Sequence, residues 1–238
     1  MTLKVMLFLQ IFAPNFLIMI KGFIFDMDGT MIDNMMVHHR AWQQKLKEYG
    51  IDWSLAEVHE KVHGVNVELL ERLFGNRFTL AERIQISKEK EIAYRNIYQS
   101  EIKLIDGLKA FLEAAKAANI PMAIATAAPP ENAYFVLENL PIRHYFKALF
   151  HSDDVTKGKP DPEVFELAAK ALGLPLQDCL IFEDSVTGAE AAYRAGCSAV
   201  ILTTSHKEAE FSHYPHILQF AKDYRSINLK ELLVPFSS

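Results

Sequence analysis

Five short apolar segments alternate with amphipathic stretches along this 238-residue chain, and the alternation constrains its fold more than any other feature. Each segment is too short and too apolar to be a surface helix, as expected of buried parallel strands joined by helices. We therefore predict an α/β fold in which a parallel sheet lies between layers of helices. The expected strands are Ile20–Phe25, Pro121–Ala125, Ala148–Phe150, Cys179–Phe182 and Ala199–Leu202.

One segment breaks this alternation. From Met35 to about Ser100 the pattern indicates helices and no strand, with Ser54 and Thr79 at expected N-cap positions. We predict a second, inserted helical unit, connected by linkers at Ile32–Asn34 and Ile102–Asp106. The expected helices are Met35–Tyr49, Leu55–Val62, Val67–Phe74 and Leu80–Tyr98.

Composition limits the classes of partner and the compartment. A formal net charge of −5 argues against a nucleic-acid partner, which normally leaves a basic footprint. Cys179 and Cys197 are expected to be free thiols in a reducing compartment, so we predict a cytoplasmic protein. The apolar stretch before Lys21 is interrupted at Pro14 and lacks a small-residue cleavage site, so no stable membrane association is expected. Residues 1–18 are interpreted as an extension upstream of a functional start at Met19.

Polar side chains follow the first expected strand where it ends. Asp26, Asp28, Gly29 and Thr30 stand there in the sequence. In a continued strand the two carboxylates would share a face about 7 Å apart, given a rise of ~3.3 Å per residue. Gly29 permits a sharp turn instead, so the Asp26 side chain and the Asp28 backbone can converge on one ion. Two neighbouring carboxylates can bind a hard cation or act separately as an acid and a base. A helix N-cap would show the same sequence pattern.

Three further clusters complete the set. Thr126 follows the second strand and offers a hydroxyl, with backbone N–H groups after it. Lys159 lies in a loop stiffened by two prolines, and Glu183-Asp184 ends the fourth strand. Each cluster alone is also explained by a helix cap or a solvated loop. Together they indicate a single site, because open α/β sheets bind ligands at the carboxyl ends of their strands.

The ordered motifs Asp26–Thr30, Thr126, Lys159 and Glu183-Asp184 resemble those of the haloacid dehalogenase superfamily. The resemblance covers nearly the whole chain from Ile20 onward, and the helical insertion looks like the cap of the β-phosphoglucomutase-like subgroup. It implies a Rossmann-like three-layer α/β/α sandwich with an inserted helical cap. The expected boundaries are 19–33 and 103–238 for the core and 34–102 for the cap.

The resemblance also implies a role for each matched residue. Asp26 would be the nucleophile that forms an aspartyl-phosphate, and Asp28 the general acid and base. Thr126 and Lys159 would hold the phosphoryl group of a small phosphorylated metabolite. The Mg²⁺ ligands would be Asp26, the backbone carbonyl of Asp28, Glu183 and Asp184. The further candidates for substrate contact are Thr30, His38, His63, Gly64, Lys90 and Ala127.

The cap residues bear on the choice between a phosphatase and a mutase. His38 aligns with a histidine that β-phosphoglucomutases use to couple cap closure to the second acid, and Lys90 matches a cap lysine. The mutase sequence Lys-Gly-Val-Ser-Arg is replaced by His63-Gly64-Val65-Asn66-Val67, which lacks the guanidinium fork for a second phosphate. We therefore predict a Mg²⁺-dependent phosphatase of sugar or polyol phosphates. A sugar-phosphate mutase is the alternative, and an inactive binding protein on the same fold a remote one.

Overall fold

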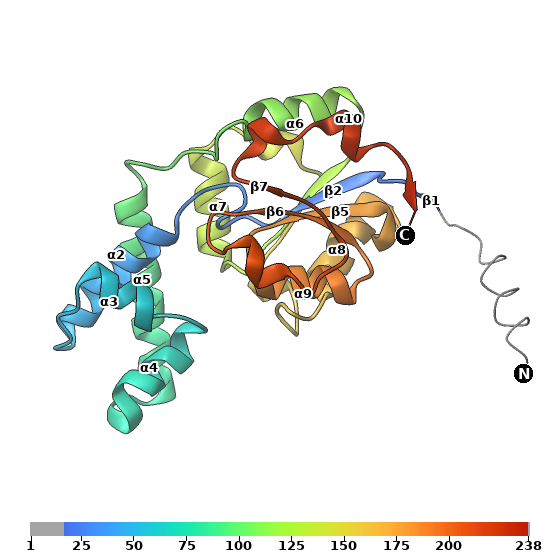
Figure 1. Ribbon diagram of the computed structural model, residues 1–238. Coiled ribbons are helices and arrows are strands. Elements are labelled where there is room, and N and C mark those ends of the chain that lie inside the picture. The colour runs from blue at the N-terminus through green and yellow to red at the C-terminus, as the bar shows by residue number, and fades with distance from the viewer. Residues whose placement is uncertain (1–16, 238) are drawn as a thin grey trace, which may run out of the picture.

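The computed structural model describes residues 17–237, and a parallel sheet of six strands forms its centre (Figure 1). The strand order is β4-β3-β2-β5-β6-β7, with all neighbouring strands parallel. The five predicted strands are confirmed, whereas β7 was not predicted. The strands are β2 (Gly22–Phe25), β3 (Met122–Ala125), β4 (Ala148–Phe150), β5 (Cys179–Glu183), β6 (Ser198–Leu202) and β7 (Ile217–Ala221).

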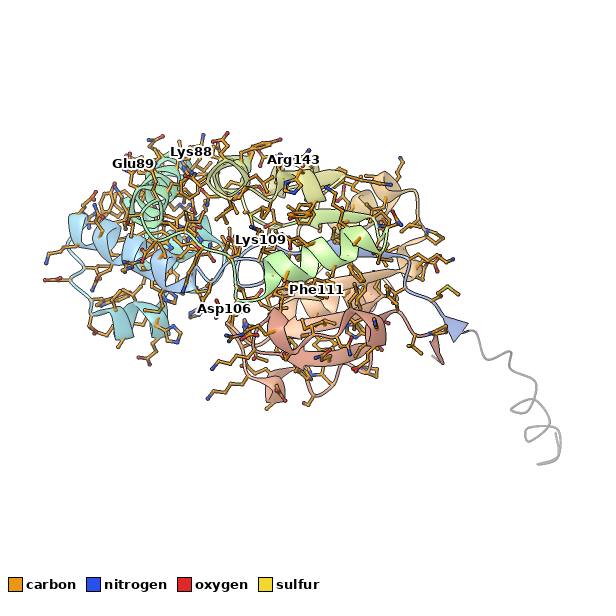
Figure 2. All side chains as sticks on the ribbon, turned by 90° about the horizontal axis from the view of Figure 1, so that it is seen from above. Lys88, Glu89, Asp106, Lys109, Phe111 and Arg143 are labelled. Atoms are coloured by element: carbon orange, nitrogen blue, oxygen red, sulfur yellow. The ribbon has the colours of Figure 1, made fainter. Side chains whose placement is uncertain are left out.

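Helices cover both faces of the sheet, which confirms the predicted three-layer sandwich. Alternating side chains of each strand point to opposite faces. Phe23 and Phe25 face α6 (Leu108–Ala117), α7 (Pro130–Asn139) and α10 (Leu229–Leu232). Ile24 faces α8 (Glu163–Leu172) and α9 (Val186–Arg194). Phe111, labelled on α6 in Figure 2, stacks on Phe23 with ring centroids 5.7 Å apart.

Strand β2 lies at the point where the strand order reverses. The chain runs from β2 outward to β3 and β4 on one side, and then returns to β5, β6 and β7 on the other. Such a switch point opens a crevice at the carboxyl ends of the strands. Phe25, the last residue of β2, pairs with both Ile124 and Phe182. The residue that follows, Asp26, therefore stands at the centre of that edge.

A group of helices is inserted between β2 and α6, as predicted. It comprises α2 (Met35–Glu48), α3 (Leu55–Lys61), α4 (Asn66–Phe74) and α5 (Leu80–Tyr98). The predicted N-caps Ser54 and Thr79 both form capping boxes. The two connecting segments lie side by side, because the N–H of Ile105 donates to the carbonyl of Met31. These helices have a small apolar core of their own around Trp42, Leu46, Val58, Val62, Leu69, Leu70 and Ile86.

The ends of the described chain meet outside the main sheet. β1 (Leu17–Ile18) pairs antiparallel with β8 (Phe236–Ser237). The interpretation of residues 1–18 as an extension lies almost entirely outside the described residues. The boundaries 19–33, 34–102 and 103–238 stay predictions. Within residues 17–237, every helix is too short or too polar to cross a membrane.

Candidate active site

The structure brings the four sequence clusters together at the carboxyl edge of the sheet. Asp26 and Asp28 follow β2, and Thr126 follows β3. Glu183 is the last residue of β5, with Asp184 directly after it. The carboxyl ends of parallel strands of similar length lie together at one edge of the sheet, so the polar residues at these ends meet there.

Lys159 joins this edge from the loop before α8. Its ammonium group donates to Asp26 Oδ1 at 2.7 Å, to Glu183 Oε1 at 2.6 Å and to the carbonyl of Ala125 at 3.1 Å. Only 5 % of its side chain is exposed. Burial alone would lower the pKa of Lys159, but the two carboxylates outweigh that effect and raise the pKa above its usual value. The lysine is therefore a permanent cation in contact with Asp26.

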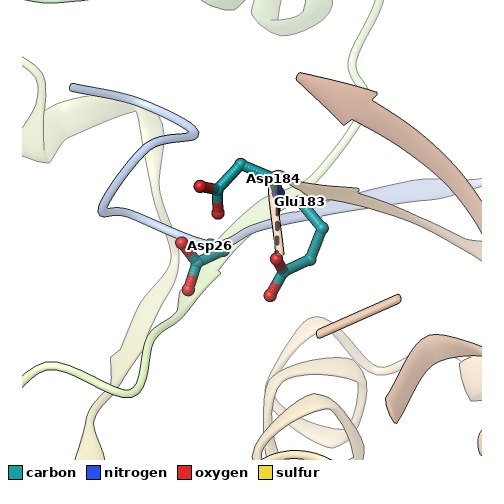
Figure 3. A group of neighbouring side chains, drawn as sticks. All are labelled: Asp26, Glu183 and Asp184. Atoms are coloured by element: carbon teal, nitrogen blue, oxygen red, sulfur yellow. Dashed lines mark hydrogen bonds between the residues drawn. The ribbon is translucent and has the colours of Figure 1, made fainter. Parts of the chain in front are cut away.

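Asp26, Glu183 and Asp184 form an acidic group (Figure 3), two members of which accept hydrogen bonds from Lys159. One carboxylate oxygen from each lies within 4.8 Å of the others. Burial, together with the neighbouring acids, raises the pKa of Asp26 to about 7 although Lys159 opposes the rise, and raises the pKa of Asp184 well above its usual value. Three carboxylates thus face one ammonium group, which leaves negative charge that a cation would balance.

Two glycines allow this crowding. Gly29 has φ +74°, and a Cβ there would lie 2.0 Å from Asp184 Oδ2. A Cβ on Gly188 would lie 1.8 Å from Glu183 Oε1. The glycines after each acidic pair therefore keep space for the carboxylates, in addition to permitting the turn at Gly29.

The carboxylate of Asp28 bonds to the inserted helices. The amide of Asn34 donates to Asp28 Oδ1 and to the Tyr94 hydroxyl, each at 2.6 Å. Burial raises the pKa of Asp28 to about 6, although the hydrogen bond from Asn34 works against the increase. A carboxyl group with such a pKa exchanges protons readily near neutral pH.

Further polar side chains from the inserted helices lie next to Asp28. The His38 ring stacks on Tyr94 with centroids 3.9 Å apart, and its Nδ1 is 3.2 Å from the Lys90 ammonium. Burial and Lys90 lower the pKa of His38 to about 3, so the imidazole is neutral. Glu91 Oε1 lies 2.5 Å from Lys90 Nζ. Asn132, from α7 on the sheet side, donates to Glu91 Oε2 at 2.8 Å.

A profile of the haloacid dehalogenase-like hydrolase family matches residues 20–196. The chain belongs to this family. It is 30 % identical over 182 residues to the fructose-1-phosphate phosphatase YqaB of Escherichia coli, a stretch covering 75 % of this chain and 94 % of that protein.

Two solved structures extend the comparison. A haloacid dehalogenase (HAD) hydrolase of family IA from Entamoeba histolytica superposes with a TM-score of 0.83 and 26 % identity, over 90 % of this chain and 98 % of that one. A β-phosphoglucomutase from Clostridium difficile gives a TM-score of 0.73 at 25 % identity, over 90 % and 96 % of the two chains. The predicted superfamily is thereby confirmed, with a β-phosphoglucomutase among the structural neighbours.

Within residues 17–237, four of the predicted substrate contacts in this haloacid dehalogenase-like hydrolase make no side-chain hydrogen bond to Asp28, His38 or Lys90. Thr30 is fully buried, with its hydroxyl 3.5 Å from Asp184 Oδ1. His63 and Gly64 are exposed in the loop between α3 and α4, where the carbonyl of His63 accepts a hydrogen bond from Arg72. Ala127 is exposed after β3. Their roles in binding stay predictions.

Other residues of the site were not predicted. The hydroxyl of Ser205 donates to Asp184 Oδ2, and that of Thr204 donates to the carbonyl of Gly29 at 2.5 Å. Both follow β6, so the same rule of polar residues after a buried strand would have found them. Asn132 and Glu91 carry no comparable signal, because they lie on helices whose packing is not visible in the sequence.

We expect Asn34→Ala to raise the pKa of Asp28 above about 6 in this hydrolase, because the variant loses a hydrogen bond that stabilises the carboxylate. The measurement is a ¹³C NMR titration of the Asp28 carboxyl carbon in metal-free protein. Asn139→Ala, which removes an exposed amide bonded to the carbonyl of Phe135, is the control and should leave the titration unchanged. An Asp28 pKa that stays the same or falls in Asn34→Ala would contradict this account.

Proposed function

We propose that this protein is a Mg²⁺-dependent phosphatase of small sugar or polyol phosphates, with Asp26 as the nucleophile. The observation that carries the proposal is the contact of Asp26 with Lys159, beside two further acids at the switch point of the sheet. The similarity to a fructose-1-phosphate phosphatase supports the substrate class. We further propose a cytoplasmic location, which the buried free thiols Cys179 and Cys197 support.

The acidic group fits a hard divalent cation. Its donors are all carboxylate oxygens, the ligands that Mg²⁺ prefers. Asp26, Glu183 and Asp184 would hold the ion. Hydrogen bonds already engage both oxygens of Glu183, from Lys159 and from the N–H groups of Asp184 and Ser185. They also engage both oxygens of Asp184, from Thr30 and Ser205. When bound there, Mg²⁺ would neutralise the charge that spreads over the transferred phosphoryl group.

The side chains divide the chemistry between them. Lys159 binds Asp26 Oδ1, which leaves Oδ2 to attack phosphorus while the bond to the leaving oxygen breaks. The hydroxyl of Thr126 accepts a bond from the Ala128 N–H and keeps its own proton to donate to a phosphoryl oxygen. Asp28 gives its proton to the leaving oxygen. It then takes a proton from the water that attacks the aspartyl-phosphate, which releases phosphate and restores Asp26.

The inserted helices act in this proposal as a cap over the site, with residues 34–102 moving against the core of 19–33 and 103–238. Contacts between the two parts support it. Asn34 links Asp28 to Tyr94, and Asn132 links α7 to Glu91. Closure of the cap would exclude bulk water while Asp26 is phosphorylated.

Hydrolysis is favoured over transfer to a sugar. A mutase must hold a second phosphate while its intermediate turns around, and His63 and Val67 stand where mutases carry a lysine and an arginine. The structural similarity to a β-phosphoglucomutase keeps a mutase as the second candidate.

We expect Mg²⁺-dependent release of phosphate from a panel of sugar and polyol phosphates, lowered by at least about a thousandfold in Asp26→Asn because the nucleophile is lost. Phosphate is measured colorimetrically with Mg²⁺ or EDTA, and glucose 6-phosphate formed from β-glucose 1-phosphate is followed separately. Asp52→Asn removes an exposed carboxylate, 74 % accessible, in the loop between α2 and α3 and serves as the control. Equal phosphate release by wild type and Asp26→Asn would refute the proposed phosphatase activity. Formation of glucose 6-phosphate without phosphate release would also refute it.

Mg²⁺ should raise the melting temperature of the wild-type protein and should not raise that of Asp184→Asn, because binding to the folded state stabilises it by mass action. Differential scanning fluorimetry with increasing Mg²⁺ tests this without an activity assay. In EDTA the variant should melt no lower than wild type, since it removes a buried carboxyl group crowded by other acids. The same Mg²⁺-dependent increase in both proteins would place the cation elsewhere.

A further inference from the structure

Glu91 lies where the inserted helices meet the core, next to Asp28. Its side chain is only 15 % exposed. Oε1 accepts a hydrogen bond from Asn66 on α4 at 3.0 Å, and Oε2 accepts one from Asn132 on α7 at 2.8 Å. Helices α4 and α7 therefore each bond one oxygen of this carboxylate, which fixes its position on α5.

This carboxylate is charged. Burial alone would raise the pKa of Glu91, but the charge of Lys90, with hydrogen bonds from Lys90 and Asn132, lowers the pKa below its usual value. Its charge is felt at the site, because it contributes to the raised pKa of Asp28. A negative charge thus lies near the general acid, to which it is linked through His38 and Asn34.

The nearby cations are already engaged. The ammonium of Lys90 is 2.5 Å from Glu91 Oε1, with 3 % of its side chain exposed. The guanidinium of Arg95, one turn further along α5, donates to Asn132 Oδ1 at 2.7 Å. That bond orients the amide of Asn132 so that its nitrogen points to Glu91. Among the described residues, Lys90 therefore pairs directly with Glu91, and Arg95 acts on it through Asn132.

We propose that Glu91 is a specificity-determining residue, which selects neutral, hydroxyl-rich leaving groups and rejects those that carry a second anionic group. The inference deepens the proposed phosphatase function and rests on it. A carboxylate accepts hydrogen bonds from sugar hydroxyls and repels a second phosphate or a carboxylate. In this protein Lys90, which would otherwise attract such an anion, is held and neutralised by Glu91.

The test compares two ligands that differ by one phosphate, fructose 1-phosphate and fructose 1,6-bisphosphate. Their dissociation constants are measured by titration calorimetry with Mg²⁺, in an Asp26→Asn background that prevents turnover. Glu91→Gln keeps the shape and the acceptor oxygen but removes the charge. Glu89→Gln is the matched control, because Glu89 lies two residues away on α5 (Figure 2) and pairs with Lys45 instead.

We expect the parent to bind the monophosphate more tightly, and Glu91→Gln to shift the ratio of the two constants about tenfold toward the bisphosphate. Lys90→Gln should shift the ratio toward the monophosphate, because no ammonium group then balances the negative charge of Glu91. Glu89→Gln should leave it unchanged, and thermal melting confirms that each variant is folded. The inference is overturned if Glu91→Gln and Glu89→Gln give the same ratio, or if the parent prefers the bisphosphate. Because binding is measured, these outcomes are distinct from failure of phosphate release, which would count against the phosphatase itself.

Discussion

The buried ammonium group of Lys159 is the interaction on which the rest of the site depends. It lies between Asp26 and Glu183 at 2.7 and 2.6 Å, and it is the one cation that contacts the acidic group in the described structure. Burying carboxylates without a partner costs several kcal/mol each. Lys159 offsets part of that cost and orients Asp26 at the same time. The remaining negative charge makes the group a site for a divalent cation.

The fold explains why these residues meet. A strand order that reverses at β2 places the ends of β2, β3 and β5 side by side, and each of these strands is followed by a residue that the chemistry needs. The helical insertion leaves the sheet directly after the Asp28 turn, so its first buried polar residue, Asn34, can hold the Asp28 carboxylate. The sheet thus positions the nucleophile Asp26, whereas the inserted helices supply the groups that surround the acid Asp28.

Much of this arrangement can be predicted from the sequence. Strands β2, β3, β5 and β6 are buried and mostly apolar, so they stand out, and the polar residues that follow them can be assigned to one edge. Strand β7 was missed because the polar Gln219 interrupts its apolar run, whereas the other edge strand, β4, is wholly apolar. Glu91, Asn132 and Tyr94 could not be assigned, because their roles depend on how α5 packs against α7 and α2. Exposure of His63 and Gly64 likewise depends on a loop whose path the sequence does not define.

The most direct test of the account is to locate the phosphoryl group on the enzyme during turnover. Asp28→Asn protein is mixed with p-nitrophenyl phosphate, whose leaving group needs no general acid, so that loss of the base lets the intermediate accumulate. The reaction is quenched in acid and digested, and the peptide that contains Asp26 is analysed by fragmentation mass spectrometry. The account predicts a peptide heavier by one phosphoryl group, located on Asp26. Release of p-nitrophenol with that peptide unmodified, or with the phosphoryl group on another residue, would contradict it.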